Sequence, residues 1–303
     1  MKKGWIVLLL FALSAFAVEE EETLWEEGPS ALEYTHFLQE ALAGHDWWSA
    51  INYAKKISTE YGKSPFAVEV PYVIGEAYFN LEKWGLANEN LSQYLSKTSS
   101  PKHFEEAIHY KFLIAEKFRD GAKKHLFGAD WLPKIISGAD DALMIYDDVI
   151  AALPHHEIAA KALLGKAEIQ AKNEDYKPSL ETLDLLIRRF PKHDLAAQGF
   201  LEKSHVYLMQ LQEKNLDPAL LDLADLNLRK FRLAFPREER IGEVEKDLFK
   251  MKELFAENLM ETGRFFEKTK KKPAAILYYS KVVSEYPDTE SARIADVKLE
   301  KLR

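Results

Sequence analysis

Histidine pairs are the first residues in this sequence that could bind a metal or transfer protons. His155 and His156 are adjacent and follow Pro154, and adjacent residues at the junction of two helices point in different directions. His103 and His109 are six residues apart, which places them on different faces of a helix. A metal site needs ligands that converge on one point. The histidine spacing therefore does not predict such a site.

Two aspartate pairs, Asp140-Asp141 and Asp147-Asp148, could in principle hold a divalent cation. Gly138 precedes the first pair, however, and acidic residues stabilise the start of a helix through the helix dipole. We interpret the aspartates as residues of a helix start, and we predict neither a bound metal nor a cofactor.

Motifs for enzyme chemistry are absent from the sequence. It contains no HExxH, GxSxG or GxGxxG pattern, and no phosphate-binding GxxxxGK loop. None of the 303 residues is cysteine, which excludes a thiol nucleophile, a disulfide and a Cys-ligated zinc site. The balance of 49 acidic against 41 basic residues argues against a nucleic-acid partner, because contacts to phosphates need a basic surface. We therefore expect a protein that is not an enzyme.

The N-terminus has the pattern of a secretory signal peptide. Lys2 and Lys3 form a basic start, residues 4–13 are mostly apolar, and Ala15-Phe16-Ala17 fits a cleavage site. This apolar stretch is shorter than the roughly 20 residues that span a bilayer. We predict that the signal peptide, residues 1–17, is removed and that an acidic leader, residues 18–30, follows. The expected location is the periplasm; an uncleaved anchor is the alternative.

The elements that must position any functional residue are helices. Apolar residues recur at spacings of three and four along almost the whole chain, and no segment shows sustained alternation typical of strands. One ending recurs: a small residue is followed eleven positions later by an aromatic residue or leucine, and then by proline or glycine. The copies run over residues 50–62, 142–154, 179–191, 224–236 and 275–287, with a weaker copy over 87–99. Proline stops a helix, so each ending predicts a helix C-terminus.

Partner helices complete the repeat. Gly75, Ala167 and Ser204 lie thirteen residues after three of these endings, which gives a unit of about 37 residues with two antiparallel helices. The spacing resembles the tetratricopeptide repeat, in which small residues let two helices approach closely and aromatic residues fill the space beside them. We predict an all-α, right-handed solenoid of about six such helical hairpins over residues 31–303, closed by a helix at 289–303. A helical bundle without repeats is the alternative.

Two insertions interrupt the repeats. Residues 118–138 contain three glycines and a proline, so we expect a structured loop or a short helical excursion. Phe127, Asp130 and Trp131 are candidates for binding a partner there, unless the aromatic side chains pack back on the solenoid. Residues 237–266 lack proline and keep helical spacing, which predicts one long helix that protrudes from the stack. Its apolar stripe needs a cover, either from residues 211–221 or from another protein.

A helical solenoid offers a concave surface formed by the first helix of each pair, and that surface is the predicted partner site. It combines aromatic and carboxylate residues, which suit an extended peptide with basic or apolar side chains. The candidates in the leading repeats are Glu69, Tyr72, Glu76, Phe79, His109, Phe112, Glu116, Arg119 and Glu168. The same face continues through Lys161, Leu164, Gln198, Leu201, His205 and Leu208.

The last helix pair has a distinctive sequence. Residues 256–290, AENLMETGRFFEKTKKKPAAILYYSKVVSEYPDTE, follow the predicted long helix and end on Tyr286-Pro287-Asp288-Thr289. The insertion carries Phe127-Gly128-Ala129-Asp130. Together these features resemble the BamD family of outer-membrane assembly lipoproteins, in which a long helix likewise leads into such a pair and an insertion carries a Phe-Gly-x-Asp loop.

The resemblance implies a function as well as a fold. It implies a non-catalytic periplasmic scaffold that contacts the barrel-inserting outer-membrane subunit and helps to deliver unfolded barrel precursors. Members of that family carry an acylated cysteine after the signal peptide, and the corresponding segment here has none. We therefore expect membrane association to be indirect, through a protein partner. The alternative is a soluble periplasmic adaptor for cell-wall or division proteins.

Overall fold

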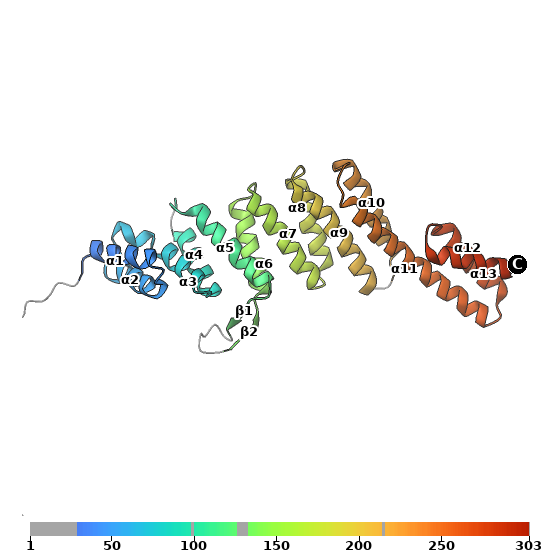
Figure 1. Ribbon diagram of the computed structural model, residues 1–303, viewed down its shortest axis with the longest axis horizontal. Coiled ribbons are helices and arrows are strands. Elements are labelled where there is room, and N and C mark those ends of the chain that lie inside the picture. The colour runs from blue at the N-terminus through green and yellow to red at the C-terminus, as the bar shows by residue number, and fades with distance from the viewer. Residues whose placement is uncertain (1–28, 98–99, 126–132, 214–215, 303) are drawn as a thin grey trace, which may run out of the picture.

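The computed structural model describes residues 29–97, 100–125, 133–213 and 216–302. Within these ranges the chain forms thirteen α-helices that stack as antiparallel hairpins into an elongated solenoid (Figure 1). The predicted signal peptide and all but the last two residues of the predicted leader lie outside the described residues, as do Phe127, Asp130 and Trp131.

Six hairpins and a closing helix make up the solenoid. The first three hairpins are α1 (Ala31–Ala43) with α2 (Trp47–Glu60), α3 (Val70–Asn80) with α4 (Trp84–Lys97), and α5 (Phe104–Arg119) with α6 (Ala139–Ala152). The next three are α7 (Glu157–Lys172) with α8 (Tyr176–Arg189), α9 (Asp194–Glu213) with α10 (Pro218–Ala234), and α11 (Ile241–Lys268) with α12 (Lys272–Glu285). Helix α13 (Glu290–Leu302) closes the stack, and a short 3-10 helix (Pro65–Val68) precedes α3. The all-α solenoid predicted from the repeats is thus confirmed.

The predicted endings coincide with the ends of the second helices. The C-cap residues of α2, α6, α8, α10 and α12 are Tyr61, Leu153, Phe190, Phe235 and Tyr286. The predicted small residues also lie where the two helices of a hairpin meet. A Cβ on Gly75 would come within 2.8 Å of Leu91, and one on Gly263 within 2.5 Å of Tyr279. Larger side chains would force these helices apart.

The core runs along the solenoid as a series of clusters rather than as one centre. The largest lies among helices α1 to α6, and a second lies mainly between α7 and α8. A third joins α9, α10 and the first half of α11, and a fourth joins the second half of α11 to α12 and α13. Such stacking means that each hairpin is stabilised by its neighbours.

Helix α11 belongs to two clusters. Val244 and Leu248 pack in the same cluster as Leu211 and Leu220, whereas Met260 packs with α12 and α13. The cover that the apolar stripe requires is therefore supplied by the chain itself, including residues from the region 211–221. This choice between the two expected covers was open in the sequence, because apolar spacing does not say which surface will meet it.

The insertion between α5 and α6 contains strands, which the sequence did not predict. Strands β1 (Lys123–His125) and β2 (Lys134–Ser137) pair antiparallel, with Lys124 opposite Ile136, and project from the side of the solenoid (Figure 1). Strands this short cannot display an alternating pattern, and glycine and proline suggested a loop instead. The expectation of a helical excursion was wrong for the described part of this insertion.

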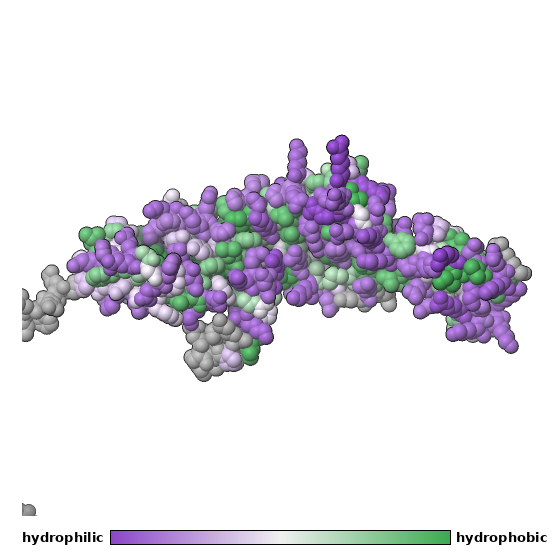
Figure 2. All heavy atoms as spheres, in the orientation of Figure 1, coloured by the Kyte–Doolittle hydropathy of each residue, from purple (hydrophilic) through white to green (hydrophobic). Residues whose placement is uncertain are grey.

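The surface is mostly hydrophilic on the face shown in Figure 2, with small separate groups of apolar side chains along the solenoid. Leu233 on α10 is the most exposed large apolar residue of the described chain, at 84%. Among the helices that the structure describes, none combines the length and the hydropathy needed to cross a membrane.

Candidate functional site

Stacked rings line the inner surface of the second and third hairpins. Tyr72 on α3 stacks on His103 at the start of α5, with ring centroids 4.5 Å apart and planes 11° from parallel. Phe79, two turns further along α3, packs against Tyr110 of α5 at 4.9 Å. The hydroxyl of Tyr110 donates a hydrogen bond of 2.9 Å to Glu76 Oε1. We call Tyr72, Glu76, Phe79, His103 and Tyr110 the aromatic groove.

Glu69 continues this network at the N-terminal end of α3. The hydroxyl of Tyr94 on α4 donates to Glu69 Oε2 at 2.8 Å and accepts from the backbone N–H of His103 at 3.0 Å. Burial raises the pKa of Tyr72 and of Tyr110, with neighbouring Glu76 acting in the same direction. Both tyrosines are therefore neutral at physiological pH, and Tyr110 acts as a hydrogen-bond donor to Glu76.

A cavity of about 400 Å³ opens beside the aromatic groove. It lies among α3, α5 and the turn that leads into α7, so it is formed by three successive hairpins. It is lined by Tyr72, Glu105, Glu106, His109, Tyr110, Leu153, His156 and Ile158. An apolar floor with two carboxylates at the edge can accept an apolar or aromatic side chain that lies next to a basic one.

A second polar cluster lies deeper along the same inner surface. Arg119 Nη2 of α5 is 2.8 Å from Glu116 Oε2, and its Nη1 is 3.6 Å from Glu168 Oε2 on α7. The Tyr146 hydroxyl from α6 donates a hydrogen bond to Glu116. Burial raises the pKa of Glu168, as do Glu202 and Glu116, whereas Arg119 lowers it. Glu116 is thus fully engaged, while Glu168 has only a long ion pair.

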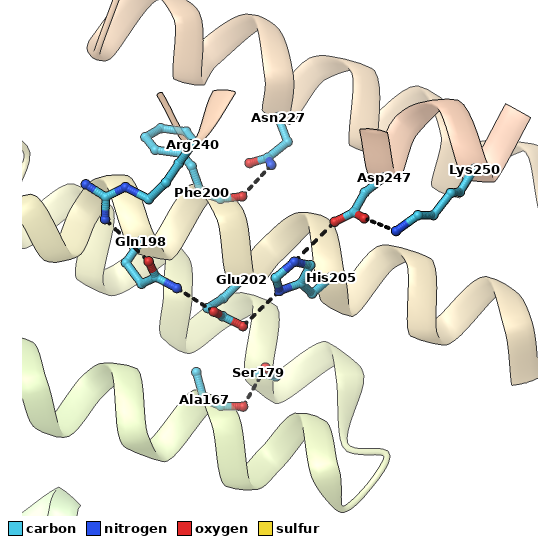
Figure 3. Close-up of polar contacts among 10 residues, drawn as sticks. All are labelled: Ala167, Ser179, Gln198, Phe200, Glu202, His205, Asn227, Arg240, Asp247 and Lys250. Atoms are coloured by element: carbon cyan, nitrogen blue, oxygen red, sulfur yellow. Dashed lines mark hydrogen bonds and ion pairs between the residues drawn. The ribbon is translucent and has the colours of Figure 1, made fainter. Parts of the chain in front are cut away.

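A third polar cluster links α9 to α11 (Figure 3). His205 lies between Glu202, one turn earlier on α9, and Asp247 on α11. Gln198 Nε2 donates to Glu202 Oε1 at 2.6 Å, and Lys250 Nζ lies 3.1 Å from Asp247 Oδ1. Burial acts to raise the pKa of Glu202, but the hydrogen bonds from His205 and Gln198 lower it below its usual value.

The structure brings most of the predicted surface residues together, but Phe112 and Leu201 are core residues, and Leu201 is only 4% exposed. Tyr72, Glu76 and Phe79 meet in the aromatic groove, and His109 lies in the adjacent cavity. Glu69 lies at one end of the groove, while Glu116, Arg119 and Glu168 form the second cluster. Phe112 is only 8% exposed and packs beside Tyr146, with ring centroids 6.3 Å apart. It is a core residue and offers no surface to a partner, because at this position α5 faces α6, the second helix of its own hairpin.

Several residues of the site were not predicted. His103, Tyr110 and Tyr94 contribute rings or hydroxyls to the groove, and Tyr146 orders Glu116. Helical spacing could have revealed Tyr94 and Tyr146. Tyr94 lies seven residues after the small residue of its second helix, and Tyr146 lies four residues after that of its own, so each shares a helix face with the small residue. His103 lies before the first turn of α5, outside any helical periodicity.

The arrangement of rings and charged groups suits the binding of an extended chain. Across the four described ranges, no three His, Asp or Glu side chains come close enough together to hold a metal ion. The groove and the two polar clusters instead place rings, carboxylates and one guanidinium along successive first helices. This surface can contact an extended chain at several points at once.

Comparison with known protein families identifies the family of this chain. The sequence profile of the YfiO family, described as outer membrane lipoprotein, matches residues 138–301. The match covers more than half of the chain. The protein belongs to the YfiO family. This is the BamD-family lipoprotein domain, so the resemblance seen in the last helix pair holds at the level of the family. A tetratricopeptide-type interaction scaffold follows from family and fold together.

Solved structures of repeat proteins are also similar to the chain. A tetratricopeptide repeat protein from Parabacteroides merdae is 15% identical, covers 90% of this chain and 98% of its own, and has a TM-score of 0.38. YrrB, a repeat protein with an unusual peptide-binding site, is 14% identical over 72% of this chain and 92% of its own, with a TM-score of 0.39. Apo RapI is 12% identical over 89% of this chain and 76% of its own, with a TM-score of 0.41. No curated protein matches the sequence.

Proposed function

We propose that the protein is a non-catalytic periplasmic scaffold that supports the assembly of outer-membrane barrel proteins through protein–protein contacts. The observation that carries the proposal is the continuous inner surface, where the aromatic groove and the Glu116–Arg119–Glu168 cluster lie on successive hairpins. Membership of an outer membrane lipoprotein family supports the location and the class of partner. The role follows from positioning a partner chain rather than from changing its covalent structure.

The chemistry of the surface indicates what it would bind. The partly exposed ring of His103, which stacks on the buried ring of Tyr72, offers apolar area, and the adjoining cavity of about 400 Å³ has room for one large side chain. Glu105 and Glu106 at its edge, and the loosely paired Glu168 further along, would favour basic groups. An extended segment with alternating aromatic and basic residues fits this surface. Unfolded barrel precursors are a source of such segments.

The proposed partners are the barrel-inserting outer-membrane subunit and its unfolded substrates. The protein would then be held at the periplasmic side of the outer membrane by contacts to that subunit. Such an arrangement needs an extended, rigid body with more than one binding surface, and the solenoid provides this because its two ends are formed by different hairpins (Figure 1).

Purification from native membranes tests the proposal. The tagged protein should retain the barrel-inserting subunit after mild solubilisation. Reversing the charge of two exposed residues at the cavity edge, Glu105→Lys with Glu106→Lys, should reduce recovery of barrel precursors. The matched control is Glu257→Lys with Glu261→Lys, which makes the same change at exposed positions of α11. Recovery of cell-wall or division proteins instead, with no barrel-inserting subunit, would refute the proposal.

A further inference from the structure

His205 joins α9 to α11 through both of its ring nitrogens. Nδ1 lies 3.3 Å from Glu202 Oε2, one turn earlier on α9, and Nε2 lies 3.3 Å from Asp247 Oδ2 on α11. The Asp247 side chain is only 5% exposed, whereas the His205 side chain is 40% exposed. Figure 3 shows the imidazole between the two carboxylates. Water and protons can therefore reach the ring, while its α11 partner is buried.

This geometry requires a charged ring. A neutral imidazole carries one N–H and one lone pair, so it can donate to only one of two carboxylates. Imidazolium donates to both. Asp247 Oδ2 is buried and has no hydrogen-bond partner among the described residues, so its contact to His205 Nε2 is an ion pair that needs a charged ring; Lys250 binds the other oxygen, Oδ1. Loss of the ring proton would leave this buried oxygen facing a lone pair, which is unfavourable.

Charged groups around the ring reinforce this state. Glu202 faces it from α9, and Asp247 and Glu243 face it from α11. Lys250 is the nearest cation on α11, and it lies on the far side of Asp247. The hydrogen bond that His205 donates to Glu202, with the charges of all three carboxylates, raises the pKa of His205 above its usual value, although burial opposes them.

Among the described residues, the other helices packed on α9 contribute no cation that acts on the ring. From α7, Glu168 is close enough to influence Glu202. From α8, Asp184 forms an ion pair of 2.5 Å with Lys203 of α9. Lys203 is two residues from His205 and therefore lies on a different face of α9. From α10, Asn227 donates its amide to the backbone carbonyl of Phe200.

The position of the contact gives it a structural role. Asp247 lies in the first half of α11, where this helix packs on α9 and α10. The second half of the same helix forms the core with α12 and α13. We propose that His205 is a proton-operated clasp that, when charged, fixes α11 to α9 and so holds the C-terminal hairpin in a defined orientation to the rest of the solenoid.

The sign of the pH dependence follows from the raised pKa of His205. Charged His205 stabilises the fold fully when the pH is below about 6.5, the pKa of histidine in the unfolded chain. This stabilisation is lost as the pH rises through the higher pKa of His205 in the folded protein. The clasp is therefore closed in mildly acidic solution and opens toward alkaline pH. Because bacterial outer membranes are permeable to protons, a periplasmic protein would experience this range directly.

Distance measurements on spin-labelled full-length protein test the clasp. The chain has no native cysteine, so Lys177→Cys on α8 and Ser284→Cys on α12 place two labels without further changes. The distance distribution should be narrow at pH 5.5 and broader at pH 8.5. In His205→Gln the distribution should no longer change with pH, whereas the control His36→Gln, at an exposed position of α1, should behave as the parent.

Two further measurements keep the test decisive. The NMR titration of His205 should give a folded pKa above about 6.5. Asp247→Asn should also lose the pH-dependent change in distance. This variant provides the test if His205→Gln does not fold. A distance distribution that is the same at both pH values in the parent, or a pH-dependent change that survives in both variants, would overturn the proposal.

Discussion

The hydroxyl of Tyr279 on α12 donates a hydrogen bond of 2.7 Å to Oε2 of Glu267 on α11. Tyr146 on α6 makes the same contact to Glu116 on α5. In both hairpins, a tyrosine of the second helix thus fixes the position of a carboxylate on the first helix. Burial raises the pKa of Tyr279, and the hydrogen bond from Tyr279 lowers that of Glu267. The hydrogen-bonded pair is thus a neutral phenol and a carboxylate.

Removing this hydroxyl should weaken the C-terminal hairpin. Tyr279→Phe deletes the donor but keeps the ring, and a hydrogen bond to a charged group contributes about 1.5–3 kcal/mol. We expect the free energy of unfolding in urea to fall toward the lower end of that range, because Lys298 still contacts Glu267 at 3.0 Å. The control is Tyr278→Phe, on the adjacent and less buried residue. Equal losses in both variants would argue against the contact.

Two glycines of α11 should respond in opposite ways to alanine. Gly263→Ala places a Cβ 2.5 Å from the buried ring of Tyr279, and overpacking of this kind costs about 1–3 kcal/mol. Gly242→Ala meets nothing within 4 Å and should stabilise the helix by about 0.5–1 kcal/mol. Thermal unfolding of the two variants measures the difference. If Gly263→Ala proves as stable as Gly242→Ala, the close helix crossing is not required.

Glu168 should select for basic side chains in a bound peptide. Its ion-pair partner among the described residues, Arg119, is 3.6 Å away, and the side chain remains 40% exposed. Glu168→Gln should weaken binding of an arginine-containing aromatic peptide by about two- to fivefold, as expected for a partly exposed ion pair. Binding of the same peptide with glutamine for arginine should not change. Fluorescence anisotropy at low and high salt measures both, and equal weakening of the two peptides would contradict this role.

Glu202 should contribute to stability at neutral pH and lose that contribution in acid. His205 and Gln198 lower the pKa of Glu202 in the folded protein despite burial. The stabilisation is therefore present above the pKa of Glu202 in the unfolded chain, and it disappears as the pH falls through its pKa in the folded protein. Glu202→Gln should therefore flatten the acid limb of the stability curve below about pH 4.3. Urea titrations between pH 2 and 6 test this, with Glu300→Gln at an exposed position as the control. An unchanged acid limb would show that the carboxylate is not involved.

The repeat architecture was predictable because it rests on local sequence. Tyr61, Leu153, Phe190, Phe235 and Tyr286 were identified from a small residue eleven positions earlier, and each ends a second helix. Helix termination depends on the residues at the terminus and the next position, and helix crossing depends on side-chain size. Both are visible without knowing what lies nearby in space.

The binding surface was predicted only in part, because its details depend on contacts between hairpins. Tyr110 reaches Glu76 across 34 positions of sequence, and His103 meets Tyr72 only because α5 packs on α3. Phe112 was misplaced for a related reason, because repeat spacing does not tell whether a ring on a first helix faces solvent or the second helix of its own hairpin. The paired strands at Lys123–His125 and Lys134–Ser137 were missed because a few residues cannot establish a period.

The shared helix α11 has a consequence for how the molecule unfolds. In a uniform repeat array, the terminal unit frays alone, because it contacts only its immediate neighbour. Here one uninterrupted backbone runs through the cluster with α9 and α10 and through the cluster with α12 and α13. Unfolding of the terminal hairpin would remove the packing partners of Met260 and Gly263, while Val244 and Leu248 would still anchor the first half of α11 in its cluster. The last five helices should consequently behave as one cooperative unit, with matched rates of amide hydrogen exchange along the whole of α11.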